Sequence, residues 1–390
     1  MKTETIRIQS VILSGVAALI SLAATGLFAP FLHGPPPPGH GSRHEWKNRQ
    51  HASAQPGDCP EIASPPTVAV FLPMTMRGAK TYYVSTDGND GSDGLTEHTA
   101  FRTIERALEA IQPGEVVSVL PGIYHEAVTL ESIGIPEEPI TVRGVRGGAT
   151  LDGRGVMTMG FWCEKCTNLI FETLELRNFT DTGIGVYLSS DIRMRKLTVH
   201  HNGSAVQLVD WELEGYGIHV DESQRVSVEN CDVYQNGPCP RPFGVLGTGI
   251  NTYGCADCVI RSNLSHDNIG GGILVEDGTN VLVEGNRVYA NLLDATEDEW
   301  WDGGIWIDGG HCITVTSNTF RGNLGPGIQI SDEDYQKPYG YILEDNVSTD
   351  NYYGIYIWNF GSDGFPPESV LRMSDNQISG NSVRDIWIVP

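Results

Sequence analysis

The sequence predicts an all-β solenoid, a fold in which short strands wind into stacked coils. Three observations predict it: 46 of the 390 residues are Gly, hydrophobic residues make up 40 % of the chain, and a short motif recurs between residues 183 and 357. Gly is well above its usual share of about 7 %, which indicates many turns. The hydrophobic content is enough for a sizeable core, so wholesale disorder is excluded.

The recurring motif is Gly-Ile-x followed by an aliphatic residue or Thr. Its copies are 23 to 34 residues apart, and each unit opens with a short alternating strand such as Val281–Glu284. Because such strands are too short to bury a face alone, we expect the units to stack. The copies begin at Gly183, Gly217, Gly249, Gly272, Gly304, Gly327 and Gly354, and a degenerate copy is Asp385–Ile388.

Two Asn residues, five or six positions apart, precede most copies of the motif. We expect their side chains to stack on successive coils and to hydrogen-bond as a ladder along the solenoid axis. This interpretation gives the Asn residues a structural role. The pairs are Asn230 and Asn236, Asn263 and Asn268, Asn286 and Asn291, Asn318 and Asn323, Asn346 and Asn351, and Asn376 and Asn381.

The first residues have the order of an export signal. Lys2 and Arg7 precede an uncharged apolar run from Val11 to Leu32. Because this run approaches the ~20 residues that span a bilayer, residues 1–32 are predicted to be either a signal peptide or a signal anchor. Residues 33–79, which are rich in Pro, are predicted to be a disordered stalk. We therefore expect an extracellular or cell-surface protein whose solenoid domain is 80–390.

The solenoid needs a cap at its N-terminal end, because an open end exposes unpaired strand edges. Residues 99–112 carry a helical apolar stripe, with Thr99 as the expected N-cap and Pro113–Gly114 as the stop. Residues 115–120 then read as a strand of the first coil. No equally clear cap is visible at the C-terminus.

Eight Cys residues in an exported chain predict disulfides. The segments Cys163–Cys166 and Cys255–Cys258 each have the CxxC spacing, which suits either a disulfide across a turn or half of a zinc site. The two segments begin 92 residues apart, farther than in a compact zinc module, so disulfides are favoured. Cys59 and Cys312 are either free or paired across the molecule.

The charge of the chain bears on its partners. The net charge is −24, from 25 Lys and Arg against 49 Asp and Glu. Such a surface repels phosphate backbones, so we expect no nucleic-acid partner.

Near the start of the solenoid stand four distinctive stretches: Tyr82–Gly91, Phe101–Ile104, Pro113–Gly114 and Pro121–Tyr124. They resemble the opening of right-handed parallel β-helix proteins of the pectate-lyase-like superfamily. With the repeats, the resemblance covers roughly residues 80–390 and implies a right-handed parallel β-helix with a short N-terminal capping helix. The superfamily includes lyases, glycoside hydrolases, epimerases and non-catalytic surface proteins, so the resemblance implies no single reaction. Residues 80–390 contain no match to the paired Asp and Gly-His-Gly of polygalacturonase-like hydrolases. They also contain no match to the Lys base of calcium-dependent pectate lyases.

A candidate site follows from the alternation of side chains across a strand. In each Gly-Ile-x-Val-x copy the Ile and Val point inward and both x positions point outward. Aromatic residues and carboxylates gather at the outward positions, which is what a sugar ring with apolar faces and a hydroxyl rim requires. The alternative is an ordinary solvated sheet face. The expected sugar-binding residues are Tyr253, Trp306, Tyr356, Trp358, Trp301, Asn251 and Gln329.

Three long insertions are expected to enter this face from one edge, and two later ones from the other edge. From the second Asn of a pair to the next Gly-Ile the chain usually takes three or four residues, but it takes 15 from Asn202 and 13 from both Asn236 and Asn291. Long loops on a rigid scaffold often carry function. We therefore expect a groove with two walls, the second being formed by residues 332–340 and 361–368.

The outward carboxylates suggest acid–base chemistry. Stacked coils are about 4.8 Å apart, so Glu276 and Asp308 are expected one coil apart, and Asp221 and Glu276 two coils apart, or about 9.6 Å. A retaining glycosidase needs about 5–5.5 Å and an inverting one about 6.5–9.5 Å, so either pair is usable. Repulsion between Glu276 and Asp308 is expected to raise one pKa. Asp302 is a third candidate carboxylate, and His219 is either a base or a solvated surface residue.

The leading hypothesis is hydrolysis of a neutral polysaccharide or oligosaccharide by a monomer. The same carboxylates are also suited to Ca²⁺, and a polyuronate lyase or epimerase uses a cation together with a base. A Ca²⁺-assisted lyase or epimerase is therefore one alternative, and a non-catalytic glycan-binding surface protein is the other. Lys is absent from the outward positions, which favours the hydrolase.

Overall fold

The computed structural model describes Cys59 and residues 80–145, 148–205, 207–209, 212–238, 244–245, 248–296, 299–333, 337–360 and 366–389. The predicted signal or anchor (1–32) lies outside the described residues, and so does the predicted stalk (33–79) apart from Cys59. No helix in the described part of the chain combines the length and apolar character of a membrane span.

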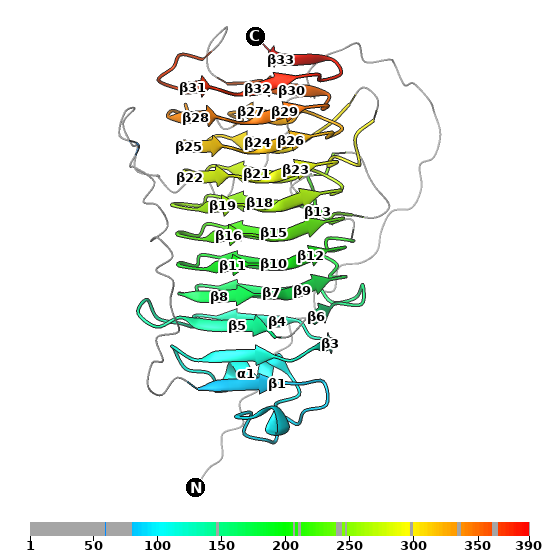
Figure 1. Ribbon diagram of the computed structural model, residues 1–390, viewed down its shortest axis with the longest axis vertical. Coiled ribbons are helices and arrows are strands. Elements are labelled where there is room, and N and C mark those ends of the chain that lie inside the picture. Colours follow the sequence, from blue (N-terminus) through cyan, green and yellow to red (C-terminus); the bar gives the residue numbers. More distant parts are fainter. Residues whose placement is uncertain are drawn as a thin grey trace, which may run out of the picture. The chain divides into compact units, whose positions relative to one another are not determined.

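The described chain from residue 80 onward winds as a right-handed β-helix of three long parallel sheets, which confirms the predicted fold class (Figure 1). Each full coil contributes one strand to sheet 1, then one to sheet 2, then one to sheet 3. Every strand of these sheets pairs in parallel with the equivalent strand of the next coil, whereas β13 and β14 form an antiparallel hairpin.

Sheet 1 consists of β1 (Thr81–Val84), β2 (Val116–Val119), β5 (Ile140–Gly144), β8 (Leu169–Glu172), β11 (Arg193–Arg195), β16 (Ser227–Glu229), β19 (Val259–Arg261), β22 (Thr279–Glu284), β25 (His311–Thr316), β28 (Tyr341–Glu344) and β31 (Leu371–Ser374). Sheet 2 consists of β3 (Gly122–Tyr124), β6 (Ala149–Asp152), β9 (Leu174–Arg177), β12 (Thr198–His200), β17 (Asp232–Tyr234), β20 (Leu264–His266), β23 (Arg287–Tyr289), β26 (Thr319–Arg321), β29 (Val347–Thr349) and β32 (Gln377–Ser379). Sheet 3 consists of β4 (Val128–Glu131), β7 (Met159–Glu164), β10 (Thr182–Tyr187), β15 (Tyr216–Asp221), β18 (Ile250–Tyr253), β21 (Ile273–Glu276), β24 (Ile305–Asp308), β27 (Ile328–Ser331), β30 (Tyr353–Ile357) and β33 (Arg384–Ile388). The hairpin strands are β13 (Gln207–Val209) and β14 (Glu212–Glu214).

The core runs inside the coils and is built by the inward residues of each strand. On β15, Ile218 and Val220 are fully buried within it, whereas His219 and Asp221 point to the outer side and are partly exposed. The inward Ile and Val or Ile residues of β10, β21, β24 and β27 join the same core, so the Gly-Ile-x-Val pattern predicted the inward and outward sides correctly.

Two asparagine ladders hold the corners on either side of sheet 2. In the ladder between sheets 2 and 3, Asn236 Nδ2 and the Asn236 backbone N–H both donate to Asn268 Oδ1, at 3.1 Å each. The other ladder lies between sheets 1 and 2 and includes Asn263 and Asn286. The prediction is wrong at Asn230, which is exposed. There Cys231 takes the ladder position and its N–H donates to Asn263 Oδ1.

The N-terminal cap is present but shorter than predicted. Helix α1 (Ile104–Ala110) begins after Thr103, whose hydroxyl caps Arg106 N–H, and Thr99 ends a separate 3₁₀ helix, η1 (Glu97–Thr99). Thr99 is not the N-cap because Phe101 is extended and pairs with β1 through its backbone. The helix buries Ile104 against the first coil, at the end of the stack where β1 lies (Figure 1).

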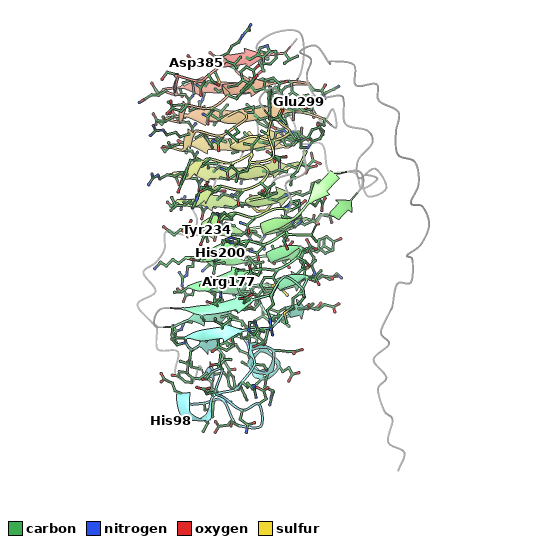
Figure 2. The ribbon with its side chains drawn as sticks, turned by 90° about the vertical axis from the view of Figure 1, so that its right-hand side faces the viewer. His98, Arg177, His200, Tyr234, Glu299 and Asp385 are labelled. Atoms are coloured by element: carbon green, nitrogen blue, oxygen red, sulfur yellow. A yellow bond between two sulfur atoms is a disulfide. The ribbon has the colours of Figure 1, made fainter. Side chains whose placement is uncertain are left out.

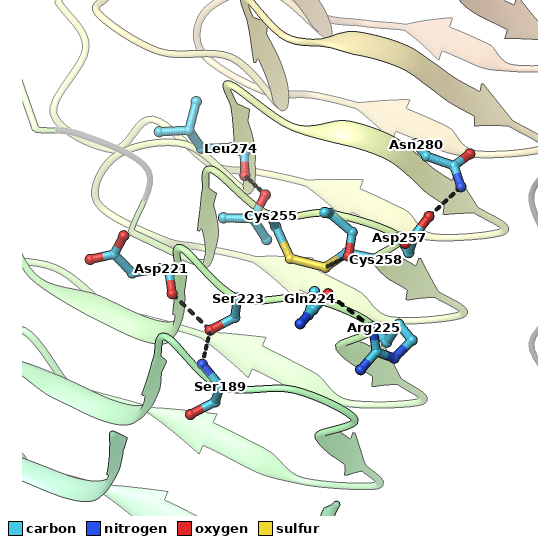
Figure 3. Close-up of a disulfide and its surroundings, with 12 residues drawn as sticks. Ser189, Asp221, Ser223, Gln224, Arg225, Cys255, Asp257, Cys258, Leu274 and Asn280 are labelled. Carbon is cyan, nitrogen blue, oxygen red and sulfur yellow. Dashed lines mark hydrogen bonds between the residues drawn. A yellow bond between two sulfur atoms is a disulfide. The ribbon is translucent and has the colours of Figure 1, made fainter. Parts of the chain in front are cut away.

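Two disulfides join described residues. Cys255 pairs with Cys258 across the turn from sheet 3 to sheet 1, as predicted (Figure 3). Cys59 pairs with Cys312 on β25, which settles the open alternative for these two residues. The predicted disulfide in Cys163–Cys166 is absent: both thiols are free and buried. Cys163 lies within β7, whereas Cys255 comes after the end of β18, so this CxxC segment is not equivalent in position to Cys255–Cys258.

Candidate functional site

The outward positions of sheet 3 form one continuous wall, as the sequence predicted. Residues scattered over some 140 positions of sequence become vertical neighbours because each strand pairs in register with the next. The wall has two columns. The first is His219, Asn251, Leu274, Trp306, Gln329 and Tyr356, and the second is Asp221, Tyr253, Glu276, Asp308 and Ser331.

The wall divides into two halves. We call the outward positions of β7, β10, β15 and β18 the open half, because His219, Asp221 and Tyr253 are partly exposed there. The outward positions of β21, β24, β27 and β30 are the covered half. Glu276 lies at the boundary between them, at the end of β21, and is also partly exposed.

The covered half is buried, which contradicts the prediction that its aromatic residues are free to stack on sugars. Trp306 is 3 % exposed and Tyr356 is 1 % exposed. Trp306 and Leu274 form a second apolar cluster, separate from the main core, against which the partly buried Trp301 and Trp358 pack. Gln329 is buried as well, and its Nε2 donates to Trp301 O at 3.3 Å.

The insertion between Asn291 and Gly304 explains this burial. It carries Trp300 and Trp301 to the outer side of sheet 3, where the Trp300 ring lies edge-on to Tyr356 with centroids 5.5 Å apart. The prediction that this insertion enters the face is confirmed, but it covers the face instead of walling a groove.

Asp308 is a buried carboxylate within the covered half. Its Oδ1 accepts hydrogen bonds from Ser331 Oγ at 2.7 Å and from the Glu333 N–H at 3.0 Å. Burial, and then the charges of Glu333 and Glu276, raise the pKa of Asp308 well above its usual range. The expected pKa effect of the Glu276–Asp308 pair is therefore present, but Asp308 is not accessible to a substrate.

Asp302 is also buried, with no measurable exposure. Its Oδ1 accepts from Gly303 N–H at 2.6 Å and its Oδ2 from Gly271 N–H at 3.2 Å. A side chain at Gly271 would collide with this carboxylate, since a Cβ there would lie 2.3 Å from it. Asp302 therefore joins two coils and does not reach the outer face as the predicted third acid.

His219 lies at the centre of the open half. Its Nε2 is 3.9 Å from Asp221 Oδ2, and its ring packs against Tyr216 with centroids 4.5 Å apart. Its Nδ1 is buried and has no hydrogen-bond partner among the described residues. The same holds for both amide atoms of Asn251, the next residue in the column, which is fully buried. Buried polar groups are normally hydrogen-bonded, so both residues retain unused capacity at this point.

Two aromatic residues of the open half, Trp162 and Tyr187, were not among the predicted site residues. Trp162 on β7 lies one coil before Gly185, which is in register with His219. The Trp162 ring extends over Gly185, and its centroid is 6.5 Å from those of both Tyr187 and His219. The segment Gly160–Cys163 begins 23 residues before Gly183, so one further step of the repeat would have found Trp162.

A second row was also missed, on the outer face of sheet 2. Figure 2 shows Arg177, His200 and Tyr234 on successive coils, and the column continues to His266 and Tyr289. The four rings from His200 to Tyr289 stack with centroids 4.7, 5.1 and 4.7 Å apart. Each ring stands two residues before the second Asn of its pair, so the repeat contains the signal.

A cavity of about 730 Å³ lies at the corner where the chain passes from sheet 2 to sheet 3. We call it the corner cavity. It is lined by residues at or after the ends of β3, β6, β9, β12, β17, β20 and β23, and none of the predicted site residues lines it.

Metal binding has no geometric support in the part of the chain that the structure describes. No group of three or more His, Cys, Asp or Glu side chains there is arranged to hold an ion. The suggested Ca²⁺ and zinc sites therefore find no ligand set among the described residues.

Comparisons with known proteins agree with this architecture. An uncharacterized protein, YwoF of Bacillus subtilis (strain 168), is 27 % identical over 315 residues, which are 71 % of this chain and 64 % of the relative, so the match spans less than two thirds of that curated relative. The crystal structure of pectate lyase Pel9A has a TM-score of 0.57 at 18 % identity and covers 78 % of this chain and 79 % of its own. The A-module of mannuronan C-5 epimerase AlgE6 from Azotobacter vinelandii has a TM-score of 0.50 at 17 % identity and covers 72 % and 82 %. At these identities the two structures show a shared fold.

A family model assigns the chain directly. The model described as "Right handed beta helix region" matches residues 151–293 and 215–389, together more than half of the chain. With three parallel sheets and two asparagine ladders, the chain belongs to the right-handed β-helix family.

Proposed function

We propose that the protein is an exported polysaccharide-active enzyme that hydrolyses a glycan on the open half of the sheet 3 wall. One observation carries the proposal. Asp221 and Glu276 are both partly exposed, lie two coils apart in one column, and have Tyr253 between them. Two coils correspond to about 9.6 Å.

This spacing favours an inverting mechanism. Inverting glycosidases separate their carboxyl groups by about 6.5–9.5 Å, which leaves room for a water molecule on the far side of the sugar. One carboxyl group protonates the glycosidic oxygen while the other activates that water. The retaining alternative required Glu276 and Asp308, and the burial of Asp308 disfavours it.

The open half also offers a surface for sugar rings. Trp162 and Tyr187 replace the buried Trp306 and Tyr356 as platforms, because both are partly exposed and their rings lie near parallel, at 26°. Aromatic faces pack against the C–H faces of sugars. The names of two structures with the same fold, a pectate lyase and a mannuronan epimerase, add support for a polysaccharide substrate.

A second candidate function is elimination or epimerisation of a polyuronate. It is favoured by His219 and Asn251, whose buried polar atoms have no hydrogen-bond partner among the described residues. Such a reaction needs a base to remove the proton next to the substrate carboxylate and a group to engage that carboxylate. His219, which is partly exposed, is the base in this version.

A panel of polysaccharides distinguishes these functions. Hydrolysis releases new reducing ends, elimination produces the ultraviolet absorbance of an unsaturated uronate, and epimerisation changes the sugar composition without cleavage. For the hydrolase, proton NMR of the first product should show inverted anomeric configuration. A protein that retains a glycan on an affinity gel but forms no product is a binding protein instead.

Variants test the assignment itself. Asp221→Asn and Glu276→Gln should each lower kcat by at least about 100-fold if they are the acid–base pair. Glu222→Gln is the matched control, because Glu222 is the exposed neighbour of Asp221 at the end of β15. Full activity in both Asp221→Asn and Glu276→Gln would refute the carboxylate pair even if the protein is an enzyme.

A further inference from the structure

The corner cavity extends along seven successive coils, each of which contributes at least one lining residue. Asn178, His201, Gln235 and Asp267 each follow a strand of sheet 2 and have positive φ values of 59°, 57°, 52° and 53°. All four residues line the cavity. Because coils repeat at about 4.8 Å, the cavity meets a polar residue at each of these steps along the solenoid axis.

The two carboxylates of this cavity are already engaged. Asp152 Oδ1 accepts from Arg154 N–H at 2.9 Å and Asn178 Nδ2 at 3.0 Å, and its Oδ2 accepts from Arg177 Nε at 3.1 Å. Asp267 Oδ2 is hydrogen-bonded to His266 Nδ1 at 2.6 Å. These groups shape the wall, and their carboxylates are not available as a catalytic pair.

Other lining groups keep hydrogen-bonding capacity. Within the described part of the chain, the amide of Gln235, the hydroxyl of Ser204 and the guanidinium of Arg154 make no side-chain hydrogen bond that the structure records. His201 keeps one ring nitrogen, Nε2, for a ligand, because its Nδ1 is hydrogen-bonded to His200 Nδ1 at 2.7 Å. Burial, with the neighbouring His200 and Arg177, lowers the pKa of His201.

The cavity also has an apolar end. Ile269 and Leu293 line it on the side of the later coils. Amide, hydroxyl, guanidinium and imidazole groups beside aliphatic carbon match a saccharide, which combines hydroxyl groups with C–H faces. Phosphate-rich ligands fit poorly, because Asp152 and Asp267 border the cavity of a chain with net charge −24.

We propose that the corner cavity is a second, non-catalytic glycan-binding site, which holds a short oligosaccharide along the solenoid axis. Its volume of about 730 Å³ lies within the range of about 300–1,000 Å³ typical of ligand pockets. The site is separate from the open half of sheet 3 and binds whether or not the protein hydrolyses anything.

The test measures binding with turnover blocked. The full-length chain carrying Asp221→Asn and Glu276→Gln is screened against hexasaccharides of cellulose, xylan, mannan, chitin and polygalacturonate, and the ligands found are titrated by calorimetry. Gln235→Leu should weaken binding of at least one hexasaccharide by 10-fold or more. Arg154→Gln, a milder change on an exposed side chain, should weaken binding of the same hexasaccharide by a smaller factor.

Two controls separate this site from the proposed active site. Gln224→Leu makes the same change on the turn between sheets 3 and 1 and should leave binding unaltered. Trp162→Ala should also leave this binding component intact, since Trp162 lies in the open half. The inference is overturned if none of the hexasaccharides binds, if folded Gln235→Leu and Arg154→Gln both bind as the parent does, or if Trp162→Ala alone abolishes all binding. Loss of catalysis in Asp221→Asn, by contrast, tests only the hydrolase proposal.

Discussion

The open and covered halves of sheet 3 have the same backbone pattern and opposite surroundings. In both halves the outward residues are in register and alternate with buried aliphatic residues. Trp162 in the open half is partly exposed, while Trp306 in the covered half is 3 % exposed. The repeat thus decides which way a side chain points, whereas an insertion decides whether it meets water.

This difference changes what an outward aromatic residue does. In the covered half, Trp306 Nε1 donates to Ser331 Oγ at 2.7 Å and its ring joins an apolar cluster, so it stabilises the later coils. In the open half, the Trp162 ring lies over Gly185 with no such enclosure and remains available to a ligand. Four predictions break or sharpen the comparison.

Trp306→Ala should have the largest effect. Removing a buried Trp costs about 3–5 kcal/mol of unfolding free energy, and this variant also leaves Ser331 without its donor. Urea denaturation followed by circular dichroism measures the loss. Trp162→Ala, on the open half, should cost less than about 1 kcal/mol. Equal losses in the two variants would show that the halves do not differ in enclosure.

Ladder variants should destabilise both halves equally. Asn323 Nδ2 donates to Val288 O and Asn351 Oδ1, and its Oδ1 accepts twice from Asn291. Losing these bonds in Asn323→Ala should cost about 2–4 kcal/mol in the same denaturation assay, because each buried bond contributes about 0.5–1.5 kcal/mol. Asn236→Ala, beside the open half, should cost as much. A clearly smaller loss in either variant would mean that the ladder is not uniform.

Asp308→Asn should change how stability depends on pH. The pKa of Asp308 is raised in the folded state, so its contribution is present below its ordinary pKa of 3.8 and is lost as pH rises through the higher folded-state value. The amide oxygen of Asn can still accept from Ser331 and Glu333. The variant should therefore lose less stability than the parent between mildly acidic and neutral pH. If the urea midpoints of the two proteins changed with pH in the same way across this range, the result would contradict the burial of an ionisable group here.

Gly185→Ala should have the smallest effect on stability and a specific effect on Trp162. A Cβ at Gly185 would lie 2.6 Å from the Trp162 ring, which must move, but the ring is partly exposed and has room. Unfolding free energy should fall by less than about 1 kcal/mol, while tryptophan fluorescence changes and, under the proposed function, so does the affinity for a glycan. In a Trp162→Ala background the second substitution should leave affinity unchanged. If Gly185→Ala lowered affinity further in the Trp162→Ala background, the loss would come from a change in the backbone and not from movement of the Trp162 ring.

The sequence was sufficient for the parts of the molecule that repeat. The Gly-Ile-x-Val steps predicted the coils, the inward and outward sides of sheet 3, and the ladders, because period-two alternation and recurrent Asn are local signals. Asn230 was misassigned because it stands next to Cys231, the residue that holds the rung. The predicted start of the helix was wrong for a similar reason, since Phe101 pairs with β1 before the helix begins.

The exposure of the site could not be predicted in the same way. Whether Trp306 or Asp308 meets solvent depends on where Trp300 and Trp301 fold, and an insertion outside the repeat has no period from which its path can be read. The burial of Asp302 could not be predicted either, because its carboxylate accepts a hydrogen bond from the N–H of Gly271, which lies 31 residues earlier. The ring column from His200 to Tyr289 was readable, but no chemistry in the sequence drew attention to it.

The ladder between sheets 2 and 3 has a consequence for how such a protein diversifies. The chain leaves each coil at a ladder Asn and returns at a Gly, and this excursion is 15 residues from Asn202 to Gly217 but three from Asn351 to Gly354. Both rungs are hydrogen-bonded to the coils above and below whatever the length between them. Segments can therefore be grafted or deleted at this corner without changing the register of the neighbouring coils, so loops can change in length and sequence one at a time on an unchanged scaffold.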